Sequence, residues 1–235
     1  MNAARHHHEV VHPHGSTERI GEIVLGGQDG LVNVLGVILG VAAATQSTRV
    51  VVVAALAAAI AESLSMAAVA YTSSVAEGER YRSERARELR HIATVPEIER
   101  EEVRAMYARK GFSGDLLDRI VETITRDKDV WLAVMMSEEH GLAPVDRRAS
   151  LRSALVVGSS ALVGSILPLL PFAVFSVGLA SWAAVLLSGA TLFAFGVYKA
   201  RATIGHPIRG GAELAFIGIA SALAAWGIGL LLRIQ

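Results

Sequence analysis

The sequence predicts an all-α, polytopic membrane protein with five transmembrane helices and a three-helix cytoplasmic insert. Two observations predict this class. Hydrophobic residues make up 52% of the 235 residues, and the mean hydropathy of +0.45 exceeds that of ordinary soluble proteins. Most Asp and Glu residues lie between Glu77 and Asp146, so a net charge of zero conceals one apolar part and one strongly charged part.

Five segments are apolar over the roughly 20 residues that a helix needs to cross a bilayer. They cover residues 20–44, 50–75, 154–175, 177–198 and 211–232. The predicted organisation is a His-rich N-terminal tail (1–19), transmembrane helices 1 and 2 (20–75), a cytoplasmic helical metal-binding domain (76–150) and transmembrane helices 3 to 5 (151–235). The N-terminal segment lacks the basic stretch and early apolar core of a signal peptide, so the first span is expected to be retained.

The basic residues of the short loops predict the orientation, because cytoplasmic loops are enriched in Lys and Arg. Lys199, Arg201 and Arg209 place the loop between the fourth and fifth spans inside. The N-terminus and the insert are then cytoplasmic, and the C-terminus is external. No organellar targeting signal is visible, which favours a plasma (inner) membrane.

Ionisable residues within the predicted spans are the first functional candidates, because a charge in the bilayer is costly unless it has a partner or water. Asp29 lies near the middle of the first span, although a span that began later would make it a helix cap. Glu62 and Met66 are four residues apart and share a face of the second helix. A hard oxygen beside a soft thioether suits a divalent metal such as iron(II), although a lone Met is more often a core residue.

The insert is predicted to form helices over 77–90, 96–109 and 115–140, the first continuing the second span. The pairs Glu88/His91 and Glu99/Glu102 each project from one helical face. The chain has no Cys, so a transition metal must be held by carboxylate, imidazole or thioether groups. The metal-ligand candidates are Glu88, His91, Glu99, Glu102, Met135, Met136 and Glu139. Alternating Glu and Arg more often form a solvated, salt-bridged face.

Two further patterns leave their alternatives open. The N-terminal His6, His7, His8, His12 and His14 are either a metal-capturing tract or, as we favour, a disordered tail. Small residues at four-residue spacing, Gly26 with Gly30 and Gly36 with Gly40, allow close helix packing, within one chain or between two.

Several motifs together resemble the vacuolar iron transporter family. They are GGQDGLVN in the first span, SLSMAAVAYTSSVAEGERY in the second, TVPEIEREEV and WLAVMMSEEHGL in the insert, and SILPLLPF in the third span. The match runs from about Gly21 to Leu232, nearly the whole chain. These motifs are specific in combination.

The resemblance implies a homodimer that moves iron(II), and in some cases manganese, out of the cytosol in exchange for protons. It implies a transporter rather than an enzyme, with divalent metal ions, protons and the bilayer as partners and no nucleic acid. Asp29 and Met66 match transport-path residues of the family, and Glu62 lies one turn from the family's second-span glutamate, whose position holds Ala58. His91 replaces a carboxylate of the insert, which favours zinc, cobalt or another borderline metal there.

Two other functions remain open from the sequence. Glu88-Leu89-Arg90-His91 fits the Glu-x-x-His element of ferritin-like di-iron proteins, so the insert is alternatively a membrane-anchored iron(II) oxidase. Such bundles use two of these elements and four helices, whereas the sequence shows one element and three helices. A non-transporting membrane scaffold is the third possibility.

Overall fold

The computed structural model describes residues 14–45, 47–202 and 205–232, in which eight α-helices, one π-helical turn and one 3-10 segment form and no strand occurs. The all-α prediction is confirmed. Five helices are long and apolar enough to cross a membrane: Ile20–Thr45, Thr48–Thr94, Arg147–Ala173, Val177–Ala202 and Pro207–Leu231. The five predicted spans therefore each correspond to a helix. His6, His7, His8 and His12 lie outside the described residues.

The chain divides into two compact units, residues 1–71 with 151–235 and residues 72–150. Helix α3 (Thr48–Thr94) contributes to both, as expected from the absence of Gly and Pro between Val50 and Glu77. Helix α2 (His14–Thr45) begins within the segment assigned to the tail.

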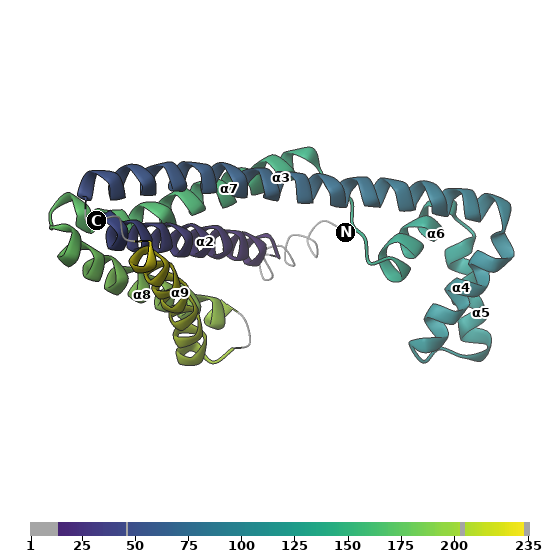
Figure 1. The fold of residues 1–235 in the computed structure, drawn as a ribbon. Coiled ribbons are helices and arrows are strands. Elements are labelled where there is room, and N and C mark those ends of the chain that lie inside the picture. Colours follow the sequence, from purple (N-terminus) through teal and green to yellow (C-terminus); the bar gives the residue numbers. More distant parts are fainter. Residues whose placement is uncertain (1–13, 46, 203–204, 233–235) are drawn as a thin grey trace. The chain divides into compact units, whose positions relative to one another are not determined.

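The membrane unit contains α2, the first part of α3, α7 (Arg147–Ile166), η2 (Leu167–Ala173), α8 (Val177–Ala202) and α9 (Pro207–Leu231). Helices α2, α8 and α9 pack against one another (Figure 1). Small side chains allow this, since Ala180 and Ala184 of α8 and Ala222 of α9 are buried with Leu35 and Ile38 of α2. Pro168 and Pro171 replace α-helix by a 3-10 segment after Ile166.

Glycines let α2 approach α7 closely within one chain. A Cβ atom added to Gly26 would lie 2.4 Å from the Val157 carbonyl oxygen, and one on Gly30 would lie 2.2 Å from that of Ala161. Both distances are far below van der Waals contact. The first Gly pair therefore serves packing inside the protomer.

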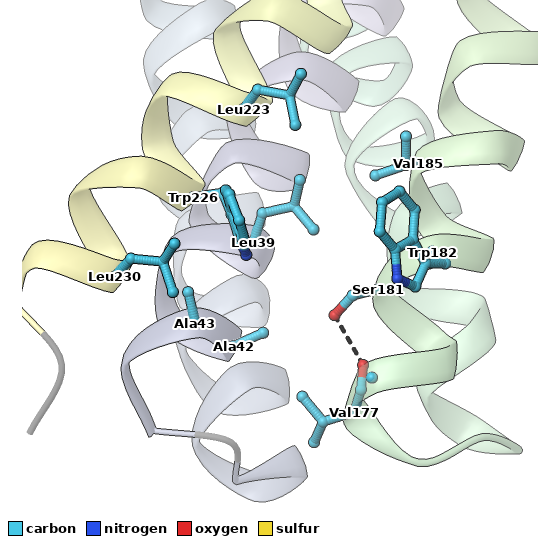
Figure 2. Close-up of a pocket in the computed structure, with 11 residues that line it drawn as sticks. Leu39, Ala42, Ala43, Val177, Ser181, Trp182, Val185, Leu223, Trp226 and Leu230 are labelled. Atoms are coloured by element: carbon cyan, nitrogen blue, oxygen red, sulfur yellow. Dashed lines mark hydrogen bonds between the residues drawn. The ribbon is translucent and has the colours of Figure 1, made fainter. Parts of the chain in front are cut away.

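An apolar pocket of about 270 Å³ lies between α2, α8 and α9 in the membrane unit. Figure 2 shows Leu39, Trp182 and Trp226 around it, with the Ser181 hydroxyl donating to the Val177 carbonyl oxygen at 2.7 Å. The lining includes no ionisable side chain. This pocket does not suit a metal ion, which needs oxygen, nitrogen or sulfur ligands.

The insert unit contains α3 from residue 72, α4 (Pro96–Arg109), α5 (Gly114–Thr125), α6 (Lys128–Val134) and the π-helical turn η1 (Met135–Glu139). Its core buries Ile92, Val103, Val121, Trp131 and Met135. Pro96 at the first position of α4 favours a helix start, and positive φ at Gly111 and Gly114 permits the turn into α5.

The segment 115–140, expected as one helix, forms three elements instead. Asp127 leaves the helical conformation at φ −111° and ψ 120°, and its carboxylate accepts hydrogen bonds from the backbone N–H groups of Asp129 and Val130. This side-chain cap starts α6 anew. The chain then changes to π-helical winding at Met135.

Candidate metal centres

A buried carboxylate, Glu88, lies at the centre of the insert's ionisable cluster. It projects from the long helix α3, and its side chain is only 3% exposed. Its Oε1 atom lies 3.0 Å from Nε2 of His140. His140 directly follows η1 and is 52 residues from Glu88 in the sequence. The Glu88 carboxylate therefore joins two elements that are remote in sequence.

Glu99 forms the second buried contact of the cluster. It lies in the first turn of α4, where the helix dipole favours a negative charge, and its side chain is also 3% exposed. Its Oε1 atom is 3.1 Å from Nδ1 of His91 on α3. Burial, together with the neighbouring carboxylates of Glu88 and Glu102, raises the pKa of Glu99 to about 7.

Glu88 and Glu99 each keep one buried oxygen, Oε2, that accepts no hydrogen bond from any described residue. An unpaired buried carboxylate oxygen costs free energy, and a bound cation removes that cost. Two groups of three side chains have one potential ligand atom each within 4.8 Å of one another: Glu88, His91 and Glu99, and Glu84, Glu88 and His140. Carboxylate with imidazole is a ligand set for divalent transition metals.

The remaining predicted insert ligands have two different environments. Met135 and Met136 are buried among apolar side chains of the insert core. Glu102 and Glu139 are exposed residues, and their negatively charged carboxylates are close enough to repel each other. Partial burial of the Glu139 carboxyl group raises its pKa, and the Glu102 charge raises it further.

Glu84 and His140 were missed by the sequence reasoning. Glu84 lies four residues before Glu88 on α3, so the i to i+4 spacing was a usable signal. His140 directly follows the predicted ligand Glu139, but nothing in the sequence places it beside α3. The salt-bridged interpretation holds for other residues, including Arg104, whose Nη1 is 2.6 Å from Asp118 Oδ1.

The membrane unit brings two carboxylates together from different helices. The Glu62 carboxyl group on α3 interacts with the side chains of Asp29 and Asn33 on α2. Asn33 donates from Nδ2 to Asp29 Oδ2 at 3.4 Å. Asp29 lies well inside α2, so it does not cap a helix. Met66 lies one turn after Glu62 on α3, and both residues are half-buried.

Known proteins are similar to this chain over most of its length. A family model described as the VIT family matches residues 20–230. "Vacuolar iron transporter 1" of Oryza sativa subsp. japonica is 30% identical over 226 residues, covering 95% of this chain and 89% of the relative. Its namesake from Arabidopsis thaliana is 31% identical over 210 residues, covering 89% and 84%. The "Vacuolar iron transporter" of Plasmodium falciparum (isolate 3D7) is 26% identical over 226 residues, covering 92% and 83%. The chain is thus a member of the VIT family.

Proposed function

We propose that this protein transports iron(II) out of the cytosol across a membrane in exchange for protons. The observation that carries the proposal is the meeting of Asp29 and Glu62 from two membrane-spanning helices. The relatives named vacuolar iron transporters, about 30% identical over most of both chains, support iron as the cargo.

Two neighbouring carboxylates explain how cation transport can be coupled to protons. Two negative charges side by side within a bilayer are costly, and either a divalent cation or protons remove that cost. A carboxylate must lose its proton to bind metal, so metal and protons compete for the same oxygens. In a protein that alternates between two openings, this competition produces antiport.

Met66 adds selectivity to this path. Its thioether lies one helical turn from Glu62 on the same face of α3. A soft sulfur beside hard oxygens favours iron(II) over magnesium or calcium, which take oxygen ligands alone. Manganese(II), which also accepts oxygen ligands, is the second cargo that we propose.

The insert gathers metal before transport. Glu88, His91 and Glu99 are its central ligands, since the partly exposed His91 meets two buried carboxylates. Glu102, Met135, Met136 and Glu139, the other candidates that the sequence predicts, are the further ligands of this proposal. Imidazole from His91 extends the range of bound metals to zinc and cobalt.

The predicted orientation gives this transport its direction. The N-terminus and the insert face the cytoplasm and the C-terminus lies outside, in a plasma (inner) membrane. The relatives are named for the vacuole, whose lumen also lies across the membrane from the cytosol. Exposed apolar side chains on α3, among them Val53, Ile60 and Leu64, fit a homodimer contact near the transport path as well as lipid.

Iron(II) uptake into proteoliposomes with an imposed pH gradient tests the proposal. The wild type is compared with Asp29→Asn and Glu62→Gln, which remove one charge each at nearly constant volume. Glu213→Gln is the matched control, because Glu213 is an exposed carboxylate near the start of the spanning helix α9. Gradient-driven uptake should be lost in the first two variants and kept in the control.

Transport that survives in Asp29→Asn and Glu62→Gln would show that the ion does not pass through this pair. Uptake that is independent of the pH gradient would refute proton exchange and leave iron transport in place. Wild type that moves neither iron(II) nor manganese(II) would refute transport itself.

Iron(II) oxidation is the second candidate, favoured by the two ligand groups that meet at Glu88. Oxidation would consume dioxygen when iron(II) is added to protein in detergent, and this consumption would require Glu88 but not Asp29. Transport has the opposite requirement, since Asp29 lies in the membrane unit. A scaffold would require neither residue.

A further inference from the structure

A second hollow of the membrane unit lies at the junction of α8 and α9. It has a volume of about 240 Å³ and is lined by the end of α8, the start of α9 and residues 205 and 206 before α9. Small residues bring the two backbones together there, since a Cβ atom added to Gly196 of α8 would collide with the Gly210 carbonyl oxygen of α9. The longer side chains of the lining are polar.

Most of these polar side chains are basic. Lys199 comes from the last turn of α8, Arg209 comes from the first turn of α9, and His206 directly precedes α9. All three residues are exposed. Glu213 is the single acidic residue among the described residues of the lining, so two full positive charges oppose one negative charge. The hollow therefore favours an anion and does not suit a metal ion.

The positive charge of Arg209 is not neutralised within the protein. Arg209 forms no ion pair with any residue that the structure describes. Lys199 already has an interaction within the protein, so Arg209 is expected to contribute most to binding an anion. The first turn of α9 contains no acidic residue and no side chain caps it, so the positive end of its helix dipole adds to the attraction.

The position of the hollow indicates where the anion comes from. Helices α8 and α9 are both candidate spans, so the hollow between their adjoining ends lies at the depth of the lipid headgroups. The predicted orientation puts this end at the cytoplasmic leaflet, which carries anionic lipids. Basic pockets between spanning helices on that side are suited to anionic headgroups.

The size of the hollow and the surface beside it also fit a lipid. Pockets for drug-sized soluble ligands have volumes of about 300–1,000 Å³, so this hollow suits a headgroup phosphate better than a larger soluble molecule. Phe216 and Ile217 follow Arg209 by about two turns of α9 and are 73% and 49% exposed. They provide an apolar surface for acyl chains next to the basic site.

We propose that this hollow binds the phosphate of an anionic phospholipid in the cytoplasmic leaflet. The Arg209 guanidinium donates two parallel hydrogen bonds to phosphate oxygens, and the Lys199 ammonium adds a second positive charge. The His206 ring donates one hydrogen bond even when it is neutral. This site goes beyond the proposed transport, because no residue of the transport path lines the hollow.

Native mass spectrometry of the full-length protein in an uncharged detergent tests the proposal. Phosphatidylglycerol, with one negative charge, and zwitterionic phosphatidylcholine with the same acyl chains are titrated into delipidated protein. The wild type should bind phosphatidylglycerol more tightly. Arg209→Gln should raise its dissociation constant about fivefold, and Lys199→Gln in the same chain should raise it further. Arg209→Lys keeps the charge and should retain most of the affinity.

The matched control is Arg152→Gln, which should bind phosphatidylglycerol as the wild type does. Arg152 is an exposed basic residue near the start of α7, cytoplasmic in the predicted orientation, and it does not line the hollow. All the substituted residues are exposed, so the variants should fold. Circular dichroism checks this before affinities are compared.

Two soluble anions distinguish a lipid from a free phosphate. Inorganic phosphate and glycerophosphoglycerol, the headgroup without its acyl chains, are added at the concentration of the lipid. Neither should displace phosphatidylglycerol, because neither contacts the apolar surface of α9. Displacement by either one would assign the hollow to a soluble anion and overturn the lipid proposal.

Three other outcomes would also overturn it. The first is equal affinity of the wild type for the two lipids. The second is unchanged phosphatidylglycerol binding in the variant that lacks both Arg209 and Lys199. The third is an equal loss of affinity in Arg152→Gln, because the attraction would then come from the basic surface as a whole rather than from this hollow.

Discussion

Replacing Glu99 by Gln should stabilise the metal-free insert at neutral pH. Folding raises the pKa of Glu99 from its ordinary 4.5 to about 7, through burial and then through the charges of Glu88 and Glu102. The folded insert therefore binds this proton more tightly than the unfolded chain does. Between pH 4.5 and 7 its stability falls as pH rises, and the loss is complete above the folded pKa.

The magnitude follows from the size of that change. At about 1.4 kcal/mol for each tenfold change in proton affinity, the buried Glu99 carboxylate costs the folded insert about 3 kcal/mol at pH 8. Gln resembles the protonated carboxyl group and avoids this cost. Glu99→Gln should therefore raise the free energy of unfolding by up to about 3 kcal/mol at pH 8 and change it little at pH 4.5.

Trp131 makes this change measurable in the intact chain. It is 4% exposed in the insert core, and the other two Trp residues, Trp182 and Trp226, belong to the membrane unit. With both replaced by Phe, tryptophan fluorescence reports on the insert alone. Urea unfolding is then followed at pH 4.5 and pH 8 with a chelator present.

The difference between variant and parent at the two pH values isolates Glu99 from other titrating groups, including Glu139. A parent insert that is as stable as the Glu99→Gln variant at pH 8 would refute the reasoning. In that case the Glu99 carboxylate is either solvated or balanced by a cation in the metal-free protein.

Three further outcomes are expected. Gly30→Ala should destabilise the membrane unit by about 1–3 kcal/mol and lower its melting temperature, because the added Cβ would meet the α7 backbone. Gly21→Ala is the control: the added Cβ has open space around it, so the melting temperature should not fall. Asp127→Ala should lower the free energy of unfolding of the insert in urea by about 1 kcal/mol, because the α6 cap is lost. Glu122→Ala, on the exposed surface of α5, should change that free energy by less than about 0.5 kcal/mol. Manganese(II) at 100 times its dissociation constant should stabilise the insert by about 2.7 kcal/mol, and no stabilisation would contradict metal binding to the folded state.

The five spans were predictable because each is a local property of the sequence. A helix that crosses a bilayer needs about 20 consecutive apolar residues, and composition alone reveals such segments. The continuation of the second span into the insert was predictable for the same reason, since Gly and Pro are absent until Gly78. The division of segment 115–140 was not, because Asp127 has a capping role that competes with its place in a helical pattern.

The candidate sites were predictable only in part. Helical spacing pairs Glu88 with His91, and a membrane position marks Asp29 and Glu62 as unusual. Spacing cannot show that His140 reaches Glu88, because 52 residues separate them and the register of helix packing decides the contact. Nor can it distinguish the buried Glu99 from the exposed Glu101 two residues later.

The sequence by itself determined the membrane class, the helices, the family and most of the residues that carry chemistry. These follow from composition, local periodicity and motifs, which depend on neighbours along the chain. Only the tertiary structure decided which ionisable side chains meet: Asp29 with Glu62 in the membrane unit, and Glu88 with His91 and His140 in the insert. The physical reason is that burial and electrostatic contact depend on how helices pack, and residues far apart in sequence set that packing.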